Sequence, residues 1–492
     1  MKKILSICMI FFFTLSLSAT EIDSAQFVNI DGAEKKDPEK QKKEKTKKEK
    51  KEKDAVRTGW TFGILPSVGY DADLGFQYGI LSNVYYFGDG SKYPDYLHSF
   101  YVEAAYTTKR YGIFRFRYDS KYLIPKHHLQ LDFSYLPDAM SDFLGYNGYQ
   151  SVYNREWTNM YKNKKDKKEN IISDEYLSRA FYKFKRDIFR IAGDIQGNIG
   201  GKWYWNAGLG LLMYNIGTVD IDMINKGKKD ENKLLPAIDG LYEKYQNWGI
   251  INKNENGGWY PYVRAGITYD SRDRQQNPRK GIYTDLFLTY SAAFGEQKEY
   301  NNLKVNYTFR HYVPIYKDYI NFSYRLACQL STAGDAPFYA NSYWNTLFIQ
   351  RVLYEGLGGG NTLRGIMRNR ILSNGFAFAN VEFRFKLVSF NIKKENFYIG
   401  LVPFLDAGMI LQPYKLEKAD ISALMNETDL SLINQYFDFD KKKIYLPHLS
   451  AGLGLKIVMN DNFVLSVDWA MPFNKQDNHS LANIYVKIGY MF

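Results

Sequence analysis

The last twelve residues of the chain, 481–492, read LANIYVKIGYMF and alternate between two kinds of side chain. Because successive side chains of a β-strand point to opposite sides, each parity forms one face. One face carries Ile484, Val486, Ile488, Tyr490 and Phe492, and the other carries Tyr485, Lys487, Gly489 and Met491. An apolar face against lipid and a mixed face toward a lumen are typical of a transmembrane β-strand. We predict that this strand continues to Phe492, with Tyr490 and Phe492 facing lipid.

An earlier segment, residues 320–331, follows the same rule with a sharper contrast. Its outward positions are Ile320, Phe322, Tyr324, Leu326, Cys328 and Leu330, and its inward positions are Asn321, Ser323, Arg325, Ala327, Gln329 and Ser331. Antiparallel sheets of soluble proteins also alternate. The polar character of the inward side chains favours a membrane barrel with a polar lumen.

The composition excludes two other classes of protein. Phe, Trp and Tyr make up 17% of the 492 residues, yet the mean hydropathy is −0.42. A helical membrane protein needs apolar runs of about 20 residues, and none follows residue 20. Disordered chains are poor in aromatic residues. The net charge of +12 is mild for this length and is partly concentrated in residues 34–54, so we expect no nucleic-acid partner.

The first 58 residues are expected to precede the barrel. Two lysines, an apolar stretch and small residues are typical of a secretory signal, which we place at residues 1–19. Residues 20–58 include a Lys/Glu-rich run that lacks aliphatic and aromatic side chains and cannot form a core. We predict a disordered periplasmic leader there and the barrel at residues 59–492. Cys328 is then the one cysteine of the mature chain, so an internal disulfide is excluded.

Counting the alternating segments predicts an all-β fold, a closed antiparallel transmembrane barrel of sixteen strands. A bacterial barrel of this kind has an even number of strands and lies in the outer membrane of a Gram-negative-type bacterium, in contact with its lipid. The strands are expected near 60–70, 73–87, 96–107, 111–121, 127–136, 176–198, 202–217, 259–270, 280–295, 300–313, 318–332, 374–388, 396–409, 446–459, 462–473 and 481–492.

The long insertions give an internal check on this count. They fall at 137–175, 218–258, 333–373 and 410–445, each after an odd-numbered strand. With the leader in the periplasm, all four insertions lie outside the cell, and long outer loops with short periplasmic turns are the rule for such barrels. A miscount by one strand would place long loops on both sides.

A glycine-rich motif in the insertion after the eleventh strand resembles a known family. Residues 358–366 read GGGNTLRGI. They are similar to the V-R-G-F/Y motif on the sixth extracellular loop of BamA/TamA-type barrels, also called the bacterial surface antigen family. The matching positions are Leu363, Arg364, Gly365 and Ile366.

Three further stretches agree with this family in order and position. They are Asp270-Ser-Arg272-Asp273 with Pro278-Arg-Lys-Gly281 in the turn after strand eight, Val313-Pro-Ile after strand ten, and Phe404-Leu-Asp406-Ala-Gly408 in strand thirteen. The resemblance covers roughly residues 59–492.

The resemblance implies that the sixth extracellular loop folds into the lumen. In the relatives, the loop arginine pairs with acidic residues on strands twelve and thirteen, and the matching positions here are Glu382 and Asp406. The alternation independently places both in the lumen. Arginine suits this role because its planar guanidinium binds carboxylates bidentately and stays charged. Two interpretations of Arg364 remain open: it pins a static plug, or it takes part in a working conformational cycle.

One departure from the family concerns the periplasmic side. Relatives that assemble or translocate proteins carry POTRA domains before the barrel, and residues 20–58 are too short and too lysine-rich to form one. The chain therefore resembles the POTRA-less members of the family. A separate periplasmic or outer-membrane partner would have to deliver client proteins.

The two ends of the barrel carry further signals. Gly63 weakens strand pairing and Pro66 lacks a backbone donor, so the closure between the first and last strands should be loose. Two interpretations of this feature remain open. The junction opens sideways, or Pro66 merely lies at a position that makes no ladder hydrogen bond. Ile488, Tyr490 and Phe492 resemble the C-terminal signal by which such barrels are recognised. The chain itself would then be a client of the barrel-assembly machinery.

Enzyme motifs are missing from the sequence. It contains neither G-x-S-x-G nor H-E-x-x-H. The adjacent His127 and His128 point to opposite faces of a strand, which is poor geometry for one metal. We expect no enzyme activity, no cofactor and no metal site. The sequence favours a barrel that assists protein assembly or translocation with partners over a passive channel or a surface-exposed binding protein.

Overall fold

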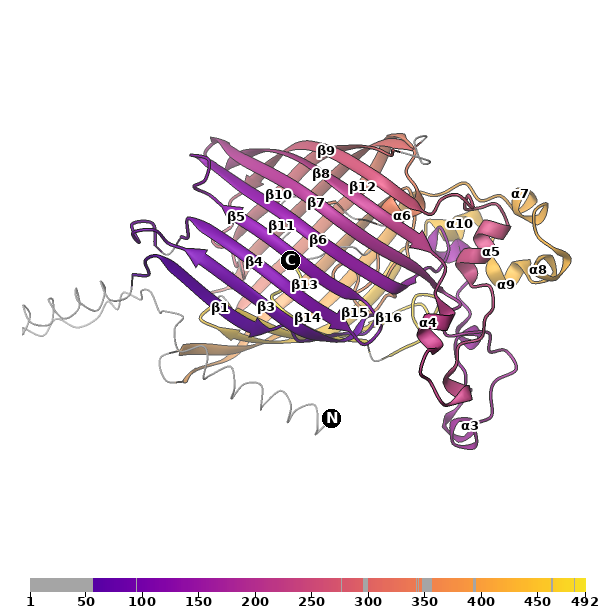
Figure 1. Ribbon diagram of the computed structural model, residues 1–492. Helices are drawn as coiled ribbons and strands as arrows, with labels where there is room; N and C mark the ends of the chain where they lie inside the picture. Colours follow the sequence, from indigo (N-terminus) through magenta and orange to yellow (C-terminus); the bar gives the residue numbers. More distant parts are fainter. Residues whose placement is uncertain are drawn as a thin grey trace, which may run out of the picture.

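The computed structural model describes residues 56–492, apart from Pro94, Gln276, 295–299, Ser342, Trp344, 347–355, 393–394, Asn462, Ala482 and the side chain of Glu231. The predicted signal at residues 1–19 and nearly all of the predicted leader lie outside the described residues. The described chain forms one twisted sheet that closes on itself, with loops and short helices gathered at one end (Figure 1).

Sixteen antiparallel strands form the closed barrel, as predicted. β1 (Trp60–Pro66) and β2 (Gly69–Asp71) together make the first strand, because both pair with β3 in one register. The other strands are β3 (Gly75–Tyr86), β4 (His98–Thr107), β5 (Gly112–Ser120), β6 (His127–Asp142), β7 (Lys183–Gly200), β8 (Trp203–Gly217), β9 (Gly257–Asp270), β10 (Gly281–Ala292), β11 (Asn301–Tyr316), β12 (Ile320–Gly334), β13 (Gly375–Ile392), β14 (Glu395–Gln412), β15 (His448–Met459), β16 (Phe463–Pro472) and β17 (Asn483–Ile488). Each strand from β3 onward pairs with the next, and β17 pairs with β2.

The predicted alternation is confirmed across the barrel wall. On β12, Ser323 and Arg325 point inward and are buried, whereas Leu326 is 45% exposed on the outer face. Cys328 follows on that outer face and is partly buried. An apolar outer face and a polar inner face place these strands as lipid-spanning segments around a polar lumen.

The predicted boundaries between two neighbouring strands were wrong. β6 continues to Asp142, and residues 176–182 form turns rather than the start of β7. Phe181 and Tyr182 are both buried in the apolar core of the loops. Two consecutive side chains cannot point to the same side of a strand, so packing among the loops overrides the local alternation here.

The prediction that alternation continues to Phe492 was also wrong. β17 ends at Ile488, and Gly489 takes a φ of +93°, which turns the chain inward. Tyr490 and Phe492 are 7% and 8% exposed and lie inside the barrel instead of facing lipid.

Contacts inside the lumen explain this inward turn. Tyr490 packs with Tyr398 and three valines, and Phe492 packs with Tyr312. The guanidinium carbon of Arg384 lies 4.1 Å from the centre of the Tyr490 ring, and its Nη2 donates to the carbonyl oxygen of Phe492 at 3.1 Å. Such cation–aromatic contacts are strongest away from water, and alternation along the sequence carries no information about them.

The four long loops lie together at one end of the barrel, which we call the loop end; the other is the turn end (Figure 1). The loops hold the short helices, and none in the described residues is long and apolar enough to span a membrane. These are η1 (Gly148–Gln150), η2 (Arg155–Trp157), α3 (Lys164–Glu169), α4 (Ile221–Asn225), η3 (Glu231–Lys233), α5 (Leu241–Asn247), α6 (Phe338–Asn341), α7 (Lys418–Ser422), α8 (Glu427–Ser431), α9 (Ile433–Tyr436) and α10 (Lys441–Ile444).

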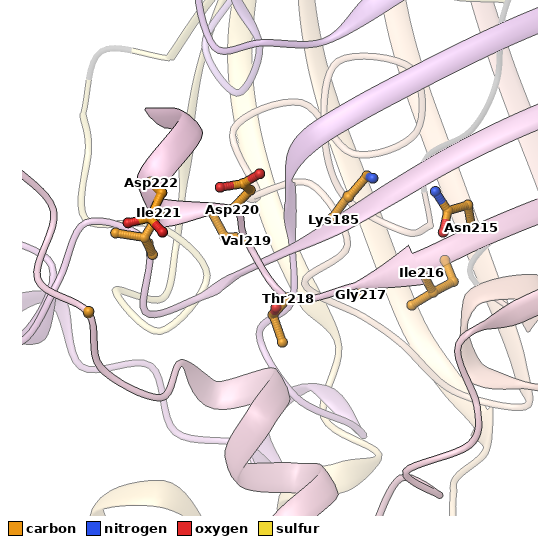
Figure 2. A pocket seen from close by; sticks show the side chains of 10 residues that line it. Lys185, Asn215, Ile216, Gly217, Thr218, Val219, Asp220, Ile221 and Asp222 are labelled. Atoms are coloured by element: carbon orange, nitrogen blue, oxygen red, sulfur yellow. The ribbon is translucent and has the colours of Figure 1, made fainter. Parts of the chain in front are cut away.

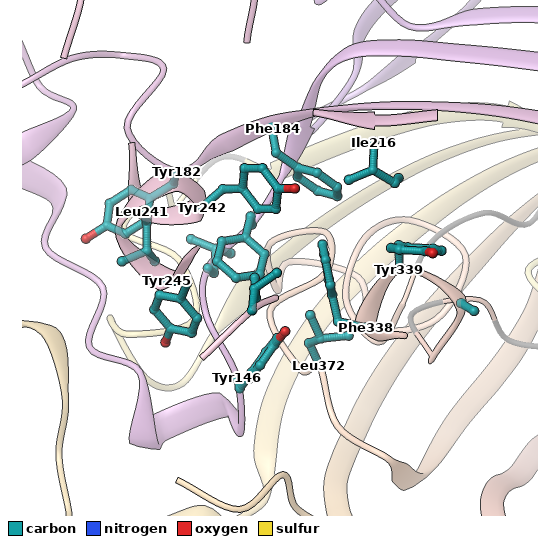
Figure 3. Close-up of a cluster of buried hydrophobic side chains, with 14 of the residues drawn as sticks. Tyr146, Tyr182, Phe184, Ile216, Leu241, Tyr242, Tyr245, Phe338, Tyr339 and Leu372 are labelled. Atoms are coloured by element: carbon teal, nitrogen blue, oxygen red, sulfur yellow. The ribbon is translucent and has the colours of Figure 1, made fainter. Parts of the chain in front are cut away.

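An aromatic core holds these loops to the strand ends (Figure 3). Tyr242 and Tyr245 of α5 and Phe338 of α6 surround Phe143, which follows β6. The rings of Phe143 and Tyr245 meet edge to face, with centres 5.1 Å apart and planes at 90°. This geometry is favourable for aromatic pairs, and the core covers the loop end of the lumen.

The loop between β12 and β13 folds into the lumen, as predicted for the sixth extracellular loop. Arg190 of β7 donates to the Tyr343 hydroxyl at 2.9 Å, and Arg264 of β9 donates to the Thr346 carbonyl at 2.6 Å. Tyr343 and Thr346 of the loop therefore lie against the inner wall. The same loop then returns to the opposite wall as a hairpin.

Candidate functional site

The hairpin of residues 356–371, here called the inner hairpin, contains the predicted motif. It is held by bridges between Leu357 and Ile371 and between Gly359 and Leu363. Leu363 and Ile366 are fully buried. They belong to an apolar cluster with Ala327, Leu357, Ile371, Phe376, Phe378, Ile410 and Ile444. The two apolar positions of the motif thus fix the hairpin to the wall formed by β12, β13 and β14.

Gly365 is required by the geometry of the turn. Its φ is +88°, a conformation that favours glycine. A Cβ atom at this position would lie 3.1 Å from both Ala470 Cβ and Met471 N. The absence of a side chain lets the hairpin approach β16 closely.

Arg364 is fully buried between two carboxylates. Its Nε and Nη2 donate to Oδ2 and Oδ1 of Asp406 at 2.9 and 3.0 Å, and its Nη1 donates to Oε1 of Glu382 at 2.9 Å. The backbone N–H of Arg364 also donates to Asp406 at 3.0 Å. The guanidinium carbon lies 3.4 Å from the centre of the Phe404 ring. The structure thus brings together the arginine and both predicted partners.

Three further charged residues complete this site, which we call the Arg364 network. Asp468 lies 3.6 Å from Arg364 Nη1 and pairs with Lys456, and Arg384 pairs with Glu382 at 2.8 Å. The network balances three cations against three carboxylates. An unpaired buried charge costs several kcal/mol, so the loss of any one member of the network is costly.

Arg368 and Arg370 are hairpin residues that the sequence reasoning missed. Arg368 pairs with Asp138 at 2.8 Å and Asp142 at 2.9 Å, both on β6. Arg370 Nε donates to the Gln476 carbonyl at 2.9 Å, in the loop before β17. A signal was available, because three arginines fall within seven residues of a loop stretch, 356–373, that has no acidic residue. Their partners therefore had to come from other parts of the barrel.

The inner hairpin also contacts the last strand. The Gly365 N–H donates to the Tyr485 hydroxyl at 3.0 Å, and Lys487 donates to the Gly360 carbonyl. Asn483 Nδ2 lies 3.4 Å from the Gly365 carbonyl. β17 is therefore held by the hairpin inside the barrel as well as by its neighbouring strands.

We expect Tyr485→Phe to loosen this contact. The change removes the acceptor of the Gly365 N–H and leaves a buried donor unsatisfied, which costs about 1–3 kcal/mol. Amide hydrogen exchange of residues 356–371 should then accelerate. Tyr70→Phe is the matched control, because Tyr70 lies on the adjoining strand but is 43% exposed on the outer face. Equal exchange in wild type and Tyr485→Phe would show that the hydroxyl does not hold the hairpin.

The junction between β17 and the first strand, here called the seam, is short. In the described chain, β17 and β2 pair at two positions, Tyr485 with Asp71 and Val486 with Tyr70, whereas β16 and β17 pair at six. The predicted seam residues Gly63 and Pro66 lie in β1, which pairs with β3 but not with β17.

The predicted turn motif lies at the turn end, away from the Arg364 network. Asp270 accepts two guanidinium hydrogen bonds from Arg272 at 2.9 and 2.8 Å, and Asp273 accepts two backbone N–H groups later in the turn. Pro278 is buried. Gly281 has a φ of +107°, and a Cβ there would clash with the Ser271 carbonyl oxygen. These contacts explain the motif: its residues fix the conformation of the turn between β9 and β10.

The predicted C-terminal signal is divided between two environments. Ile488 is 50% exposed on the outer face, whereas Tyr490 and Phe492 are buried in the lumen. An assembly signal is read from the unfolded chain, so this arrangement does not test that role, which stays a prediction. Among the described residues, no three His, Cys, Asp or Glu side chains are placed to hold a metal.

The Omp85 superfamily domain matches residues 82–492, which include the inner hairpin, both of its carboxylate partners and β17. The chain belongs to the Omp85 superfamily. Omp85 barrels lie in the outer membrane of Gram-negative bacteria and act in protein assembly or transport. The expected family is thereby confirmed.

Solved structures similar to this Omp85 chain include barrels from three bacteria. BamA from Haemophilus ducreyi lacking POTRA domains 1–3 is 13% identical, with 88% of this chain and 70% of that chain covered and a TM-score of 0.48. CdiB from Escherichia coli is 11% identical, with 86% and 62% covered and a TM-score of 0.49. CdiB from Acinetobacter baumannii is 9% identical, with 88% and 59% covered and a TM-score of 0.45. This chain thus spans less than two thirds of either CdiB chain, and no curated protein matches it.

Proposed function

We propose that this Omp85 barrel assists the insertion or export of proteins at its seam, and that the inner hairpin holds the seam closed between cycles. The main observation behind this proposal is the short pairing of β17 with β2, which has two residue pairs. The other segment of the first strand, β1, lies next to it and does not pair with β17. A separate periplasmic or outer-membrane partner that delivers client proteins is part of this proposal.

The outward side chains of β1 are apolar, and its pairing supports a seam that receives other strands. Trp60, Phe62 and Ile64 are 62%, 74% and 66% exposed. The chain turns inward at Gly489, so the edge of β1 is not covered by β17. Within the part of the chain that the structure describes, β1 pairs with β3 and not with β17, and a strand edge without a neighbour is a template for pairing with another strand. A client strand could therefore add to β1 without first breaking a long ladder.

The hairpin contacts support a connection between the lumen and the seam. The same turn that presents Arg364 to Glu382 and Asp406 also presents the Gly365 N–H to Tyr485 of β17. Displacement of the hairpin would remove both sets of contacts together. The Arg364 network would then favour the closed seam, and a client or partner that displaces the hairpin would favour opening.

Depletion of the protein in its native host tests this function. We expect several unrelated outer-membrane or surface proteins to be lost from the outer-membrane proteome, without loss of their transcripts. Re-expression of the wild-type protein should restore them, and co-purification from those membranes should identify the delivering partner. An unchanged proteome after depletion would reject an assembly role and favour a channel or a surface-binding protein.

A further inference from the structure

An aromatic row marks the edge of the lipid-facing surface on β4, β5 and β6. Tyr106, Phe114 and Tyr135 are exposed on the outer wall near the loop end. Their rings lie side by side, with centres 6.3 Å apart between Tyr106 and Phe114 and 6.1 Å apart between Phe114 and Tyr135. Aromatic side chains gather at the level of lipid headgroups in membrane proteins of this kind. The row therefore places the outer headgroup layer at the turn between β4 and β5.

Arg110 lies in that turn, between the strands that carry Tyr106 and Phe114. Its backbone is held on both sides, because its N–H donates to the Thr107 carbonyl at 3.0 Å and its carbonyl accepts the Ala139 N–H at 3.3 Å. Within the described part of the chain, its guanidinium makes no hydrogen bond or ion pair. A guanidinium has five N–H donors. A fixed backbone thus presents a cation whose donors remain available to a ligand.

A second cation, Lys228, lies on the loop that follows α4. Figure 2 shows the chain leaving β8 and turning at Asp220 into this helix. Asn225, the last residue of α4, closes the loop, because its side chain donates to the Leu235 carbonyl at 2.9 Å and accepts the Leu235 N–H at 2.8 Å. Lys228 Nζ donates to Asn225 Oδ1 at 3.3 Å and to the Lys233 carbonyl at 3.0 Å. One of its three N–H groups is left for a ligand.

Lys228, Arg179 and Arg110 gather into one group of positive charges, here called the basic cluster. Arg179 Nη2 donates to the Lys233 carbonyl at 3.3 Å, and Lys228 Nζ contacts the same oxygen. Desolvation lowers the pKa of Lys228, and the neighbouring charges of Arg179 and Arg110 lower it further. Among the described side chains, no carboxylate pairs with any of the three, and Asp230 pairs instead with Lys233 at 3.0 Å. Like charges without a counterion repel one another, so a bound anion would stabilise the cluster.

We propose that Arg110 and Lys228 bind the phosphate group of an outer-leaflet lipid, and that Arg179 adds to the positive charge around it. Arginine and lysine are the usual partners of phosphate oxygens. The turn of Arg110 joins the strands of the aromatic row, so a phosphate held there directs its acyl chains along Tyr106 and Phe114.

The charge of the basic cluster selects among headgroups. A headgroup with an amine would bring a further cation to a place where no described carboxylate pairs with the three cations. The site therefore favours a phosphorylated glycolipid without an amine. It lies at β4, β5 and the loop after α4, away from the seam, and does not depend on the proposed assembly role.

Lipid retention by the purified barrel tests this site. The full-length protein in detergent micelles is mixed with diphosphoryl lipid A or phosphatidylethanolamine, and bound lipid is counted by native mass spectrometry. We expect the wild type to retain lipid A in preference. Arg110→Ala with Lys228→Ala should weaken that retention roughly tenfold, because charge-assisted hydrogen bonds to the phosphate are lost. Equal retention by the wild type and this double variant would overturn the proposal, as would equal retention of both lipids by the wild type.

A matched double variant controls for the loss of two positive charges. Lys121→Ala with Lys202→Ala removes two exposed lysines from turns at the turn end, and it should retain lipid A as the wild type does. An equal loss of retention in this control would show a general effect of charge and would overturn the assigned site. Lys228→Glu, which reverses one charge of the basic cluster, should abolish the preference for lipid A, and an unchanged preference would contradict the assigned chemistry.

A soluble competitor distinguishes a lipid from a free phosphate ligand. Inorganic phosphate should compete poorly with lipid A, because it lacks acyl chains to contact the aromatic row. Competition equal to that of the lipid would reject a lipid in favour of a free phosphate ligand.

Discussion

Arg364→Ala is expected to leave the barrel inserted but to release the inner hairpin. The substitution leaves the buried carboxylates of Asp406 and Glu382 without their shared cation, and breaking a buried ion pair from one side costs about 3–5 kcal/mol. That cost falls on the closed position of the hairpin, because the strands keep their own backbone pairing. New protease cleavage should appear near residues 334–373 when intact cells are treated from outside. Complementation of the depleted strain should fall sharply.

A matched arginine and a double variant keep this test specific. Arg179→Ala changes an exposed loop arginine whose hydrogen bond is to the Lys233 carbonyl at 3.3 Å, and it should behave as the wild type. The double variant Glu382→Gln with Asp406→Asn removes the two carboxylate charges that pair with Arg364 and should also release the hairpin. Protease resistance equal to wild type in Arg364→Ala would reject the role of the network in holding the loop. Release without loss of complementation would favour the static plug among the two interpretations of Arg364.

A disulfide across the seam is expected to abolish complementation while leaving the barrel folded. Tyr70 and Val486 are directly opposed on β2 and β17. Opposed residues of an antiparallel pair have Cα atoms about 4.5–5.5 Å apart, within reach of a disulfide. Tyr70→Cys with Val486→Cys, made in a Cys328→Ser background, should form the bond in the oxidising environment outside the cytoplasm. A cross-linked seam cannot open, so client proteins should be lost from the outer membrane.

The adjoining strand pair provides the control for this cross-link. Val467 and Val486 are opposed on β16 and β17, and Val467→Cys with Val486→Cys fixes two strands that the proposal keeps together. That variant should complement fully, and a reducing agent should restore activity to the seam-locked variant. Full complementation by the seam-locked protein under oxidising conditions would exclude a seam that opens during function.

Much of the barrel could be predicted because its signal is local. Side chains of a strand alternate with a period of two whatever lies around them, so every strand from the first to the last was predicted near its observed place. The phase of that alternation placed Glu382 and Asp406 in the lumen, and the family motif placed Arg364 in a loop that folds inward. The structure joins these three residues through hydrogen bonds of 3.0 Å or less.

The failures occur where distant segments decide the local conformation. Residues 176–182 have the composition of a strand, but Phe181 and Tyr182 are more stable in the aromatic core of the loops. Tyr490 and Phe492 continue the apolar parity of β17, yet arginine and aromatic side chains of the lumen bind them inside the barrel. No property of these residues alone distinguishes the two outcomes.

The strands, their number, the side on which the long loops lie and the family all follow from the amino-acid sequence, because each depends on periodicity or on a short motif. Which residues act together follows only from the folded barrel: Arg368 and Arg370 with β6 and the last loop, and Gly365 with Tyr485 at the seam. Closing a barrel brings together side chains more than a hundred residues apart in sequence, and hydrogen bonds of the inner hairpin span up to 230 residues. Local patterns extend over a strand or a turn and therefore cannot specify such pairs.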